Sequence, residues 1–431
     1  MKIKLFDYQQ RCIEFMKKHN GLVLYHSMGS GKTITSLAMV NQFKYFIFII
    51  STKASRKNFK DDIKKAGFDA SKFEIITYQK AIKSIINNNL SFENHSIIVD
   101  EAHHLRTATK LNLMLISECM KAKKIVLLTG TIFYNNLTDL SVLVNIIRRD
   151  EVLPETNKEF EFFYWNDLYE TPTNIETLKE RIKHTISYYK KPQYTHYPTS
   201  NTDVIKVDMS NAQISEYRHY LKKILSLDNI QHIDYSVLDK RKVNVFLNVT
   251  RQLSNTLNNS PEFPKIIQIF EHIKNNPKPV VVYSNFLNNG VLPLSVQLTK
   301  ANISYAIYYG EQSEEKRNII INNFNQKVID VLLITSAGSE SLDLKNTRYI
   351  HIMEPHWNES KINQIIGRAI RYDSHKNLPE KERNVTIIRW ISIFGYKIPY
   401  DTADEYLIKI AQKKEKMFNK FDEIIKDSSI N

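Results

Sequence analysis

One short stretch of this sequence combines the residue types that bind phosphate. It reads Tyr25-His26-Ser27-Met28-Gly29-Ser30-Gly31-Lys32-Thr33, between the apolar residues 21–24 and the apolar-periodic segment 34–40. Glycines let backbone N–H groups curl around a phosphate chain, and a helix that begins with Lys32 adds its partial positive charge. Lys32 can reach the outer phosphates, and the Thr33 hydroxyl can bind Mg²⁺. The match is partial because His26 stands where the full pattern has glycine, so a structural Gly-Ser-Gly turn is the alternative.

Two adjacent carboxylates follow another apolar run. The residues Ser96-Ile97-Ile98-Val99 lead directly into Asp100-Glu101-Ala102-His103. At the end of a strand, Asp100 can hold Mg²⁺ while Glu101 orients and deprotonates an attacking water. The same Asp-Glu pair would also suit a helix N-cap with acids in the first turn. Because the pair follows a phosphate loop, we favour the hydrolytic interpretation.

Two arginines far downstream could complete such a site. They lie in Gln364-Ile365-Ile366-Gly367-Arg368-Ala369-Ile370-Arg371, where helical spacing would place Gln364, Gly367, Arg368 and Arg371 on one side. Two guanidinium groups on one helix face could clamp a γ-phosphate delivered by another domain. A surface arginine pair is the ordinary alternative.

A glutamine upstream of the loop could recognise the base of a nucleotide. Gln9 belongs to a predicted amphipathic helix that carries Ile13, Phe15 and Met16. Its amide donates and accepts hydrogen bonds at once, which suits the adenine edge. As a surface glutamine it would have no such role.

Strands that alternate with helices must position these groups. Apolar runs predict strands near 21–24, 45–50, 74–78, 96–99, 124–128, 279–283, 303–308, 331–335, 349–353 and 385–388. This alternation predicts an α/β fold with right-handed, doubly wound parallel sheets.

Polar residues close several of the predicted strands. Ligands bind at the carboxyl edge of an open parallel sheet, and hydroxyl, amide and lysine groups contact nucleic-acid phosphates without reading sequence. We therefore expect a nucleic-acid strand to contact Thr52, Lys53, Thr77, Ser284, Asn285 and Thr335.

The length of 431 residues predicts two or three domains. Residues 150–191 are helical in pattern and rich in aromatic side chains, which we interpret as core rather than a base-stacking surface. Residues 192–203 are polar, carry two prolines and lack aliphatic side chains, which predicts a linker. The boundaries are thus 1–191 for a first domain and 204–431 for a second domain that ends in a C-terminal helix.

Composition narrows the class of partner. The formal net charge of +14 favours a polyanion, nucleic acid rather than membrane, although a Lys-rich solvated surface would give the same excess. Two cysteines without a CxxC pattern argue against a disulfide framework or a structural zinc. The N-terminus lacks an apolar signal core, and the longest apolar run, 45–50, is too short for a membrane span. We expect a soluble, cytoplasmic protein.

Taken in order, these motifs resemble those of superfamily 2 helicases and translocases, in particular the Swi/Snf-like branch. Motif II is a DEAH box, and Asn135-Asn136-Leu137 repeats a phrase of that branch after motif III. The remaining matches are Tyr8-Gln9 (glutamine motif), Gly29 to Thr33 (motif I), Leu128-Thr129-Gly130-Thr131 (motif III), Thr335 to Leu344 (motif V) and Gln364 to Arg371 (motif VI).

The chain more closely resembles the poxvirus-type nucleoside triphosphatase I family, whose motif I also begins with histidine. Its departures from the helicase pattern are Ile132 in place of the motif III proline and Ser339 and Ser341 in place of motif V glycines. The further matching phrases are Arg371-Tyr372-Asp373-Ser374-His375, Leu378-Pro379, Arg383-Asn384-Val385, and Val207-Asp208-Met209-Ser210 followed by Gln213 and Tyr217.

The resemblance implies two tandem RecA-like domains with an ATP cleft between them, and a DNA-dependent ATPase that uses ATP and Mg²⁺. It further implies a role beside the RNA polymerase of a large DNA virus or cytoplasmic plasmid, in the cytoplasm, a viral factory or a virion. Catalysis would fall to Lys32, Asp100, Glu101, Arg368 and Arg371, and Mg²⁺ to Thr33 and Asp100. The nucleotide contacts would be Gln9, His26, Ser27, Met28, Gly29, Ser30, Gly31, Lys32, Thr33 and Asp343.

Alternatives stay open. A DEAH box also occurs in RNA helicases, although Asn135-Asn136-Leu137 and the residues after motif VI favour the DNA branch. A non-catalytic transcription subunit could retain a helicase fold, but its site should have lost some of its charged residues. A metabolic phosphate-loop kinase would leave motif VI unexplained. With no wedge domain evident, we favour translocation without strand separation.

Overall fold

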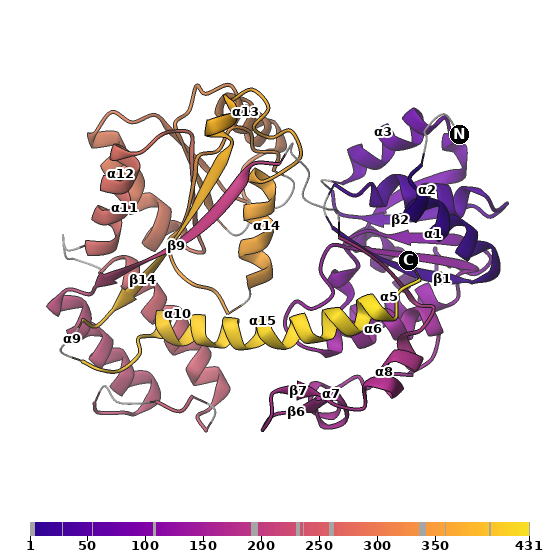
Figure 1. Ribbon diagram of the computed structural model, residues 1–431, viewed down its shortest axis with the longest axis horizontal. Coiled ribbons are helices and arrows are strands. Elements are labelled where there is room, and N and C mark those ends of the chain that lie inside the picture. Colours follow the sequence, from indigo (N-terminus) through magenta and orange to yellow (C-terminus); the bar gives the residue numbers. More distant parts are fainter. Residues whose placement is uncertain are drawn as a thin grey trace. The chain divides into compact units, whose positions relative to one another are not determined.

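The computed structural model describes residues 5–27, 29–53, 55–106, 109–190, 197–229, 233–235, 237–257, 263–335, 342–357, 359–395 and 398–430. It divides into two compact units (Figure 1). The first unit is Met1–Pro192 together with Lys414–Asn431, and the second is Gln193–Lys413. Among these described residues, no helix is both long and apolar enough to cross a membrane.

The first unit is built on a six-stranded, all-parallel sheet. Its spatial order is β3 (Phe73–Thr77), β2 (Ile47–Ser51), β4 (Ser96–Val99), β5 (Lys124–Thr129), β1 (Gly21–His26) and β8 (Ile186–Tyr189). Helices α1 (Asp7–Lys18), α2 (Lys32–Asn41) and α3 (Arg56–Ala66) cover one face. Helices α4 (Tyr78–Ile86), α5 (Lys110–Met120) and α6 (Thr138–Arg148) cover the other. Successive residues of β1 alternate between the two faces: Leu22 and Leu24 pack under α1–α3, and Val23 and Tyr25 under α4–α6.

The second unit repeats this plan. Its parallel sheet has the order β11 (Tyr305–Tyr308), β12 (Val331–Thr335), β10 (Val280–Ser284), β13 (Tyr349–Ile352), β14 (Asn384–Ile393) and β9 (Thr199–Asp208). Helices α11 (Pro264–Asn275) and α12 (Leu292–Lys300) pack on one face, and α13 (Glu314–Asn325) and α14 (Glu359–Ala369) on the other. A further cluster joins α9 (Asn211–Tyr220) and α10 (Lys240–Asn255) to the start of the last helix. The predicted doubly wound α/β fold is therefore confirmed in both units.

The predicted linker is wrong from Thr199 onward. Residues Thr199–Asp208 form β9, which pairs in parallel with the whole of β14. β9 is an edge strand whose side chains are mostly exposed, so its polar composition, which suggested a linker, is compatible with pairing. Residues 192–196 lie outside the described residues.

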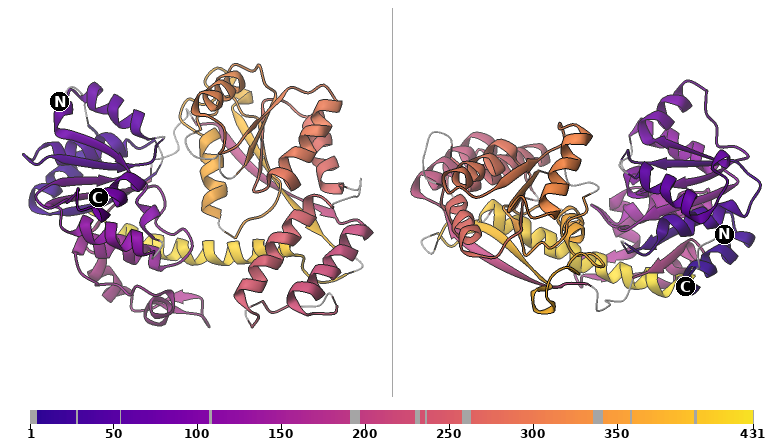
Figure 2. Two further views of the ribbon diagram at one scale, coloured as in Figure 1. Left: turned by 180° about the vertical axis from the view of Figure 1, so that it is seen from behind. Right: turned by 90° about the horizontal axis from the view of Figure 1, so that it is seen from above.

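The predicted end of the second domain is also wrong. Helix α15 (Ala403–Asp427) starts in the second unit, but its last turns belong to the first (Figure 2). Phe421 and Ile425 are buried in the core of the first unit, together with Phe133. An amphipathic helix at the end of a chain carries no local signal for the unit whose core its apolar face joins.

The aromatic segment after α6 is only partly core. Phe160, Tyr164 and Trp165 are buried, as predicted, whereas Phe162 and Phe163 are exposed. The first four of these aromatic residues in sequence order belong to α7 (Asn157–Tyr164). Trp165 begins the short strand β6 (Trp165–Asn166), which pairs with β7 (Thr171–Pro172). A helix turns only part of its surface to a core, so a continuous aromatic run must leave some rings outside.

Candidate nucleotide site

The phosphate loop joins β1 to α2, and its shape depends on two glycines. Gly29 and Gly31 have φ angles of 73° and 78°, in the left-handed region that glycine enters without steric cost. A Cβ atom at Gly31 would also lie 2.8 Å from Nε2 of Gln9. Any larger residue at position 31 would therefore disturb both the turn and α1. Met28, a predicted nucleotide contact, lies outside the described residues.

Lys32 is the first residue of α2, and its side chain reaches back over the loop. Its ammonium group donates to the carbonyl oxygens of His26, at 2.7 Å, and Ser27, at 3.1 Å. The charge is thus held over the loop at the N-terminal end of α2, where free N–H groups favour anions. Thr33, the second residue of the helix, is half-buried. The structure thus places the predicted phosphate-binding groups together.

Gln9 supports the loop from beneath. It is buried; its Nε2 donates to Thr35 Oγ1 at 3.0 Å, and its Oε1 accepts from the backbone N–H of Phe6 at 2.9 Å. The neighbouring Tyr8 donates its hydroxyl to the carbonyl of Ser30, within the loop. In the structure the Gln9 amide is hydrogen-bonded to Phe6 and Thr35, so its contact with adenine stays a prediction.

His26 faces away from the loop. Its side chain is fully buried, and Nε2 lies 2.7 Å from the hydroxyl of Ser187 on β8. Burial and the nearby Lys32 charge lower the pKa of His26 to about 3, so the imidazole is neutral at physiological pH. Because the His26 ring contacts Ser187 on β8, the predicted contact of this residue with the nucleotide would have to come from its backbone.

The carboxylate pair stands at the C-terminal end of β4, as predicted. Burial and the adjacent Glu101 raise the pKa of Asp100 to about 6, although a hydrogen bond from Ser55 and the charge of Lys32 partly oppose that shift. The Tyr78 hydroxyl donates to the Asp100 carbonyl at 2.6 Å and anchors this turn. A carboxylate with such a pKa is poised to exchange its proton for a cation.

Glu101 lies beside a neighbour in the DEAH sequence, His103. Its Oε2 lies 3.3 Å from Nδ1 of His103, whose side chain is buried. The φ angle of Glu101 is 51°, an uncommon value for a residue with a side chain and one that tends to occur at functional sites. The His103 ring also lies parallel to Tyr134, with centroids 5.8 Å apart, so motif II contacts the segment after motif III.

Two of the predicted nucleic-acid contacts of the first unit are tied into this site or its helices. Thr52 Oγ1 lies 3.1 Å from the Ser55 hydroxyl, which in turn bonds Asp100. Thr77 caps α4 by accepting from the Lys80 N–H at 3.2 Å. Lys53 is exposed. Ser55 was not predicted, because a serine three residues after a predicted contact carries no chemical signature of its own.

Other supporting residues were also missed. Tyr189 stacks on Tyr8, with ring centroids 3.7 Å apart, and Asp139 accepts from the backbone N–H groups of Tyr134 and Asn135, both at 2.7 Å. Tyr189 and Asp139 lie on a short strand and a helix whose apolar patterns give no sign of these contacts. An acid a few residues after motif III was the only available hint.

In the second unit, the predicted arginines do not share one helix face. Helix α14 ends at Ala369, so Arg371 lies beyond it, which corrects that prediction. The side chain of Arg371 nevertheless returns: its Nε donates to the Gly367 carbonyl at 3.2 Å, and its Nη1 lies 3.5 Å from Asp343 Oδ1. The structure thus brings together Arg371 and Asp343, which were predicted separately.

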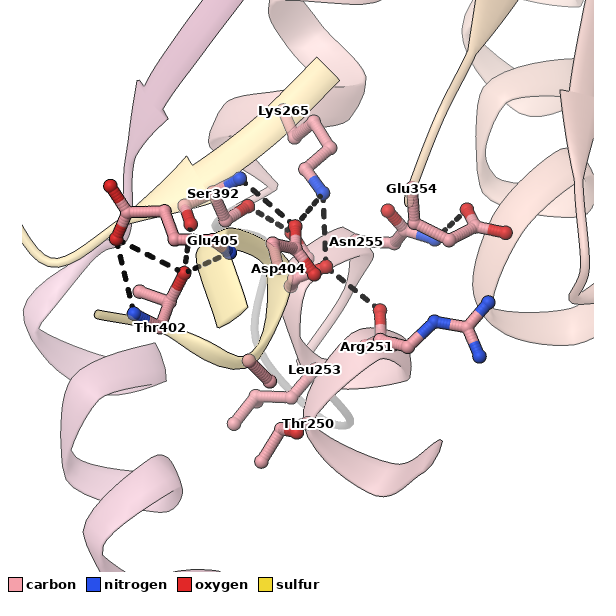
Figure 3. A network of polar contacts seen from close by, with 12 residues as sticks. Thr250, Arg251, Leu253, Asn255, Lys265, Glu354, Ser392, Thr402, Asp404 and Glu405 are labelled. Carbon is pink, nitrogen blue, oxygen red and sulfur yellow. Dashed lines mark hydrogen bonds and ion pairs between the residues drawn. The ribbon is translucent and has the colours of Figure 1, made fainter. Parts of the chain in front are cut away.

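The predicted nucleic-acid contacts of the second unit form another cluster. Glu354 is buried and accepts from the Ser284 hydroxyl at 3.0 Å and from the Asn285 amide at 3.0 Å. It also accepts from the Asn255 amide at 2.9 Å (Figure 3). Ser284 and Thr335 are themselves buried. In the structure these two hydroxyl groups shape the sheet edge rather than face solvent, whereas Asn285 is only partly buried.

Next to this cluster, a buried ion pair fastens four elements of the second unit. Lys265 on α11 lies 2.9 Å from Asp404 on α15, and their side chains are 0% and 1% exposed (Figure 3). Ser254 on α10 accepts from Lys265 at 2.9 Å, and the Ser392 N–H on β14 donates to Asp404 at 3.0 Å. The ion pair therefore supports α10, and the last residue of that helix, Asn255, donates to Glu354.

Two families of domains match the chain. The SNF2-related domain matches residues 48–262, and the helicase conserved C-terminal domain matches residues 261–373. The predicted resemblance to Swi/Snf-like helicases is confirmed.

Three viral proteins are similar to this chain over most of its length. One, from Acanthamoeba polyphaga mimivirus and named as an ATP-dependent RNA helicase, is 48% identical over 99% of this chain and 98% of its own. A termination factor NPH-I homolog of African swine fever virus is 24% identical over 95% of this chain and 76% of its own. Nucleoside triphosphatase I of Melanoplus sanguinipes entomopoxvirus is 24% identical over 100% of this chain and 79% of its own.

Proposed function

Because this chain belongs to the family of SNF2-related helicases, we propose that it is an ATP-driven motor that moves along duplex DNA. ATP hydrolase activity comes with the family, as the names of its relatives indicate. The proposal names the residues that catalyse hydrolysis, the nucleic acid along which the motor moves, and the biological process that it serves.

The observation that carries the hydrolytic assignment is the contact of Glu101 with His103, at 3.3 Å, next to Asp100 at the end of β4. We assign Glu101 as the group that orients and deprotonates the attacking water. A positioned base of this kind contributes about 10²–10⁴-fold to rate. Lys32 stabilises the charge of the outer phosphates, for which it would leave the loop carbonyls that it now binds.

The residues present fit Mg²⁺. Asp100 has its pKa raised by burial and by Glu101, which is the condition that a bound cation relieves. Among the described residues no group of three or more His, Cys, Asp or Glu could hold a metal, and Mg²⁺ characteristically binds through one or two carboxylates, waters and substrate phosphates. Asp100 and Thr33 would hold it, and the ion would neutralise phosphate charge. Arg368 and Arg371 are proposed to act on the γ-phosphate.

Duplex DNA is the preferred track. The net charge of +14, the exposed Lys53 and the hydroxyl and amide groups of Thr52, Thr77 and Asn285 suit contacts to a phosphate backbone. The Asn135-Asn136-Leu137 phrase favours the DNA branch. RNA is the second candidate, because the mimivirus relative is named as an RNA helicase.

We assign the process to transcription, beside a viral-type RNA polymerase in the cytoplasm, a viral factory or a virion. The name of the African swine fever virus relative, a termination factor, supports this assignment.

One experiment tests the enzyme and its track together. ATP hydrolysis by the purified chain is measured alone and with single-stranded DNA, duplex DNA or RNA of matched length. We expect the largest stimulation with duplex DNA; equal or greater stimulation by RNA would overturn the DNA assignment and favour the second candidate.

Variants test the site in the same assay. Lys32→Ala and Glu101→Gln should abolish turnover, and Glu101→Gln should still bind ATP. Lys60→Ala, which removes an exposed lysine of α3, is the matched control and should behave as wild type. Turnover retained by either site variant would show that the assignment of its residue is wrong.

A further inference from the structure

The first unit carries a small accessory structure that takes no part in the nucleotide site. Helix α7 and the hairpin of β6 and β7, residues 157–172, lie at the periphery of this unit, apart from its six-stranded sheet (Figure 1). We call these residues the α7–β7 platform.

The inner side of the platform is firmly built. Phe160 and Trp165 pack on Phe421 of α15, with ring centroids 5.9 Å and 6.1 Å apart. The Trp165 indole donates to Asp167 at 3.0 Å, and Lys420 of α15 donates to the carbonyl of Glu170. The backbone of the platform is therefore held by core packing and by hydrogen bonds at both ends of the turn that joins β6 to β7.

The platform also carries large apolar side chains that are exposed to water. The exposed fractions are 80% for Phe162, 48% for Phe163, 81% for Leu168 and 71% for Tyr169. Single exposed apolar side chains are ordinary, but several in one short, ordered segment indicate an interaction site. Aromatic side chains on a rigid backbone are the usual anchors of protein interfaces, because little conformational entropy is lost when they are buried.

The charge around these groups decides which kind of partner they fit. Between positions 150 and 176 the sequence has eight acidic residues and a single lysine, Lys158, in a chain whose net charge is +14. Lys420 of α15, 5.8 Å from the centroid of the Trp165 ring, adds a positive charge beside them, and the acids still outnumber these cations. Seven of those acids are exposed, and Glu161 is half-buried. A nucleic-acid phosphate backbone is repelled by such a surface, whereas lysine and arginine side chains are attracted to it.

We propose that the α7–β7 platform is a docking surface for a partner protein, which it binds through a segment that combines lysine or arginine with leucine or aromatic side chains. Phe162, Leu168 and Tyr169 anchor the apolar side chains of that segment. The surrounding carboxylates attract its basic groups and exclude nucleic acid. This proposal concerns a face of the molecule that the proposed motor function does not use.

A synthetic amphipathic helix of leucine and lysine serves as the probe, and its binding to the whole chain is measured by fluorescence anisotropy. We expect saturable binding that weakens with salt, and weaker binding of a leucine–glutamate peptide of the same pattern. The double variants Phe162→Ser with Tyr169→Ser, and Glu155→Lys with Glu170→Lys, should each reduce affinity about tenfold or more. Val237→Ser, at a site 77% exposed in the second unit, is the control for loss of one exposed apolar group and should bind as wild type.

Three outcomes would overturn the proposal. The first is equal affinity of the leucine–lysine peptide for wild type and both double variants. The second is loss of DNA binding in the platform variants, which would make the platform a nucleic-acid site. The third is self-association of the wild-type chain in light scattering that the platform variants abolish, which would make a second copy the occupant. Unchanged ATP hydrolysis by the double variants verifies that they are folded.

Discussion

The Tyr25 hydroxyl lies 3.0 Å from each carboxylate oxygen of Asp422, although 397 positions of sequence separate the two residues. Tyr25 is the next-to-last residue of β1, immediately before the phosphate loop, and Asp422 lies on α15. Lys190 lies 3.5 Å from the same carboxylate. Burial raises the pKa of both Tyr25 and Asp422. The last helix of the chain thus holds the strand that leads into the loop.

Removing this hydroxyl should weaken the first unit. Tyr25→Phe leaves the largely buried carboxylate of Asp422 without its main donor, so we expect a loss of about 1–3 kcal/mol in the free energy of unfolding. Urea unfolding measures the change. Tyr400→Phe, at an exposed tyrosine of the second unit, should leave stability unchanged. Equal stability of Tyr25→Phe and wild type would show that the hydroxyl is dispensable.

Arg371 should be needed for turnover and not for binding. Arg371→Ala removes a guanidinium that now binds the Gly367 carbonyl and Asp343, and we expect ATP affinity to persist while turnover falls by about 10³–10⁵-fold, as for other arginine fingers. Arg218→Ala, an exposed arginine of α9, is the matched control. Single-turnover hydrolysis measures the effect, and a normal rate in Arg371→Ala would exclude the finger role.

Asp100 should make the ligand-free chain less stable at neutral pH. Its folded-state pKa is raised to about 6, above the ordinary value, so its contribution to stability is complete below that ordinary value and is lost as pH rises through 6. Asp100→Asn cannot ionise, and at pH 7 it should raise the free energy of unfolding by about 3 kcal/mol relative to wild type, with little difference at pH 4. Asp61→Asn, an exposed acid, controls for surface charge. An equal effect at both pH values would contradict the pKa assignment.

The same proton should compete with Mg²⁺. Below pH 6 the Mg²⁺ concentration needed for half-maximal hydrolysis should rise by about tenfold per pH unit, because a carboxylate must lose its proton to bind a metal. His26, with its pKa lowered to about 3, does not titrate in this pH range and contributes nothing to the pH dependence of the Mg²⁺ requirement. His26→Gln should therefore leave its midpoint unmoved.

Nucleic-acid binding should be strongly salt-dependent, with Lys53 as one contributor. Lys53→Ala should weaken binding to all sequences alike and reduce the slope of log affinity against log salt by about 1. Titrations across a range of salt concentrations measure that slope. Lys300→Ala, at the exposed last residue of α12, should change neither quantity. An affinity that stays flat with salt would contradict the electrostatic basis of the proposed track.

The ion pair of Lys265 and Asp404 should act as a unit. Lys265→Met leaves an uncompensated buried carboxylate and should cost about 3–5 kcal/mol, whereas Lys265→Met with Asp404→Leu should recover much of that loss. Lys274→Met, on the exposed side of the same helix, is the control. A double variant that is less stable than either single variant would show that the pair is stabilising in itself.

Local patterns in the sequence predicted much of the architecture. The ten strands predicted from apolar runs are strands in the structure, because a strand of a parallel sheet is buried on both faces and must be apolar throughout. Four strands were missed. Of these, β8 and β9 lie at the edges of the six-stranded sheets, where a strand needs fewer apolar residues, and β6 and β7 form a hairpin of two residues a strand, too short for a periodic pattern.

The site was predictable to the same extent. The positions of Gly29, Gly31, Lys32, Asp100 and Glu101 follow from their immediate neighbours, so a motif is enough to locate them, while their roles in hydrolysis stay predictions. Ser55, Tyr134, Ser187, Tyr189 and Asp422 act through contacts that only the folded chain creates. Ser284 shows the converse error. Its position at the end of a strand was predicted correctly, but its hydroxyl donates to Glu354 within the protein.

The division of the first unit between the two ends of the chain has a consequence for biosynthesis. Residues up to Pro192 are synthesised first. All of Gln193–Lys413 is then synthesised before the part of α15 that completes the first core. At ordinary elongation rates this interval lasts roughly ten to forty seconds. During it, the surface that receives Phe421 is uncovered, while the second unit is being completed. The part of the protein that is made first is therefore the last to complete its core.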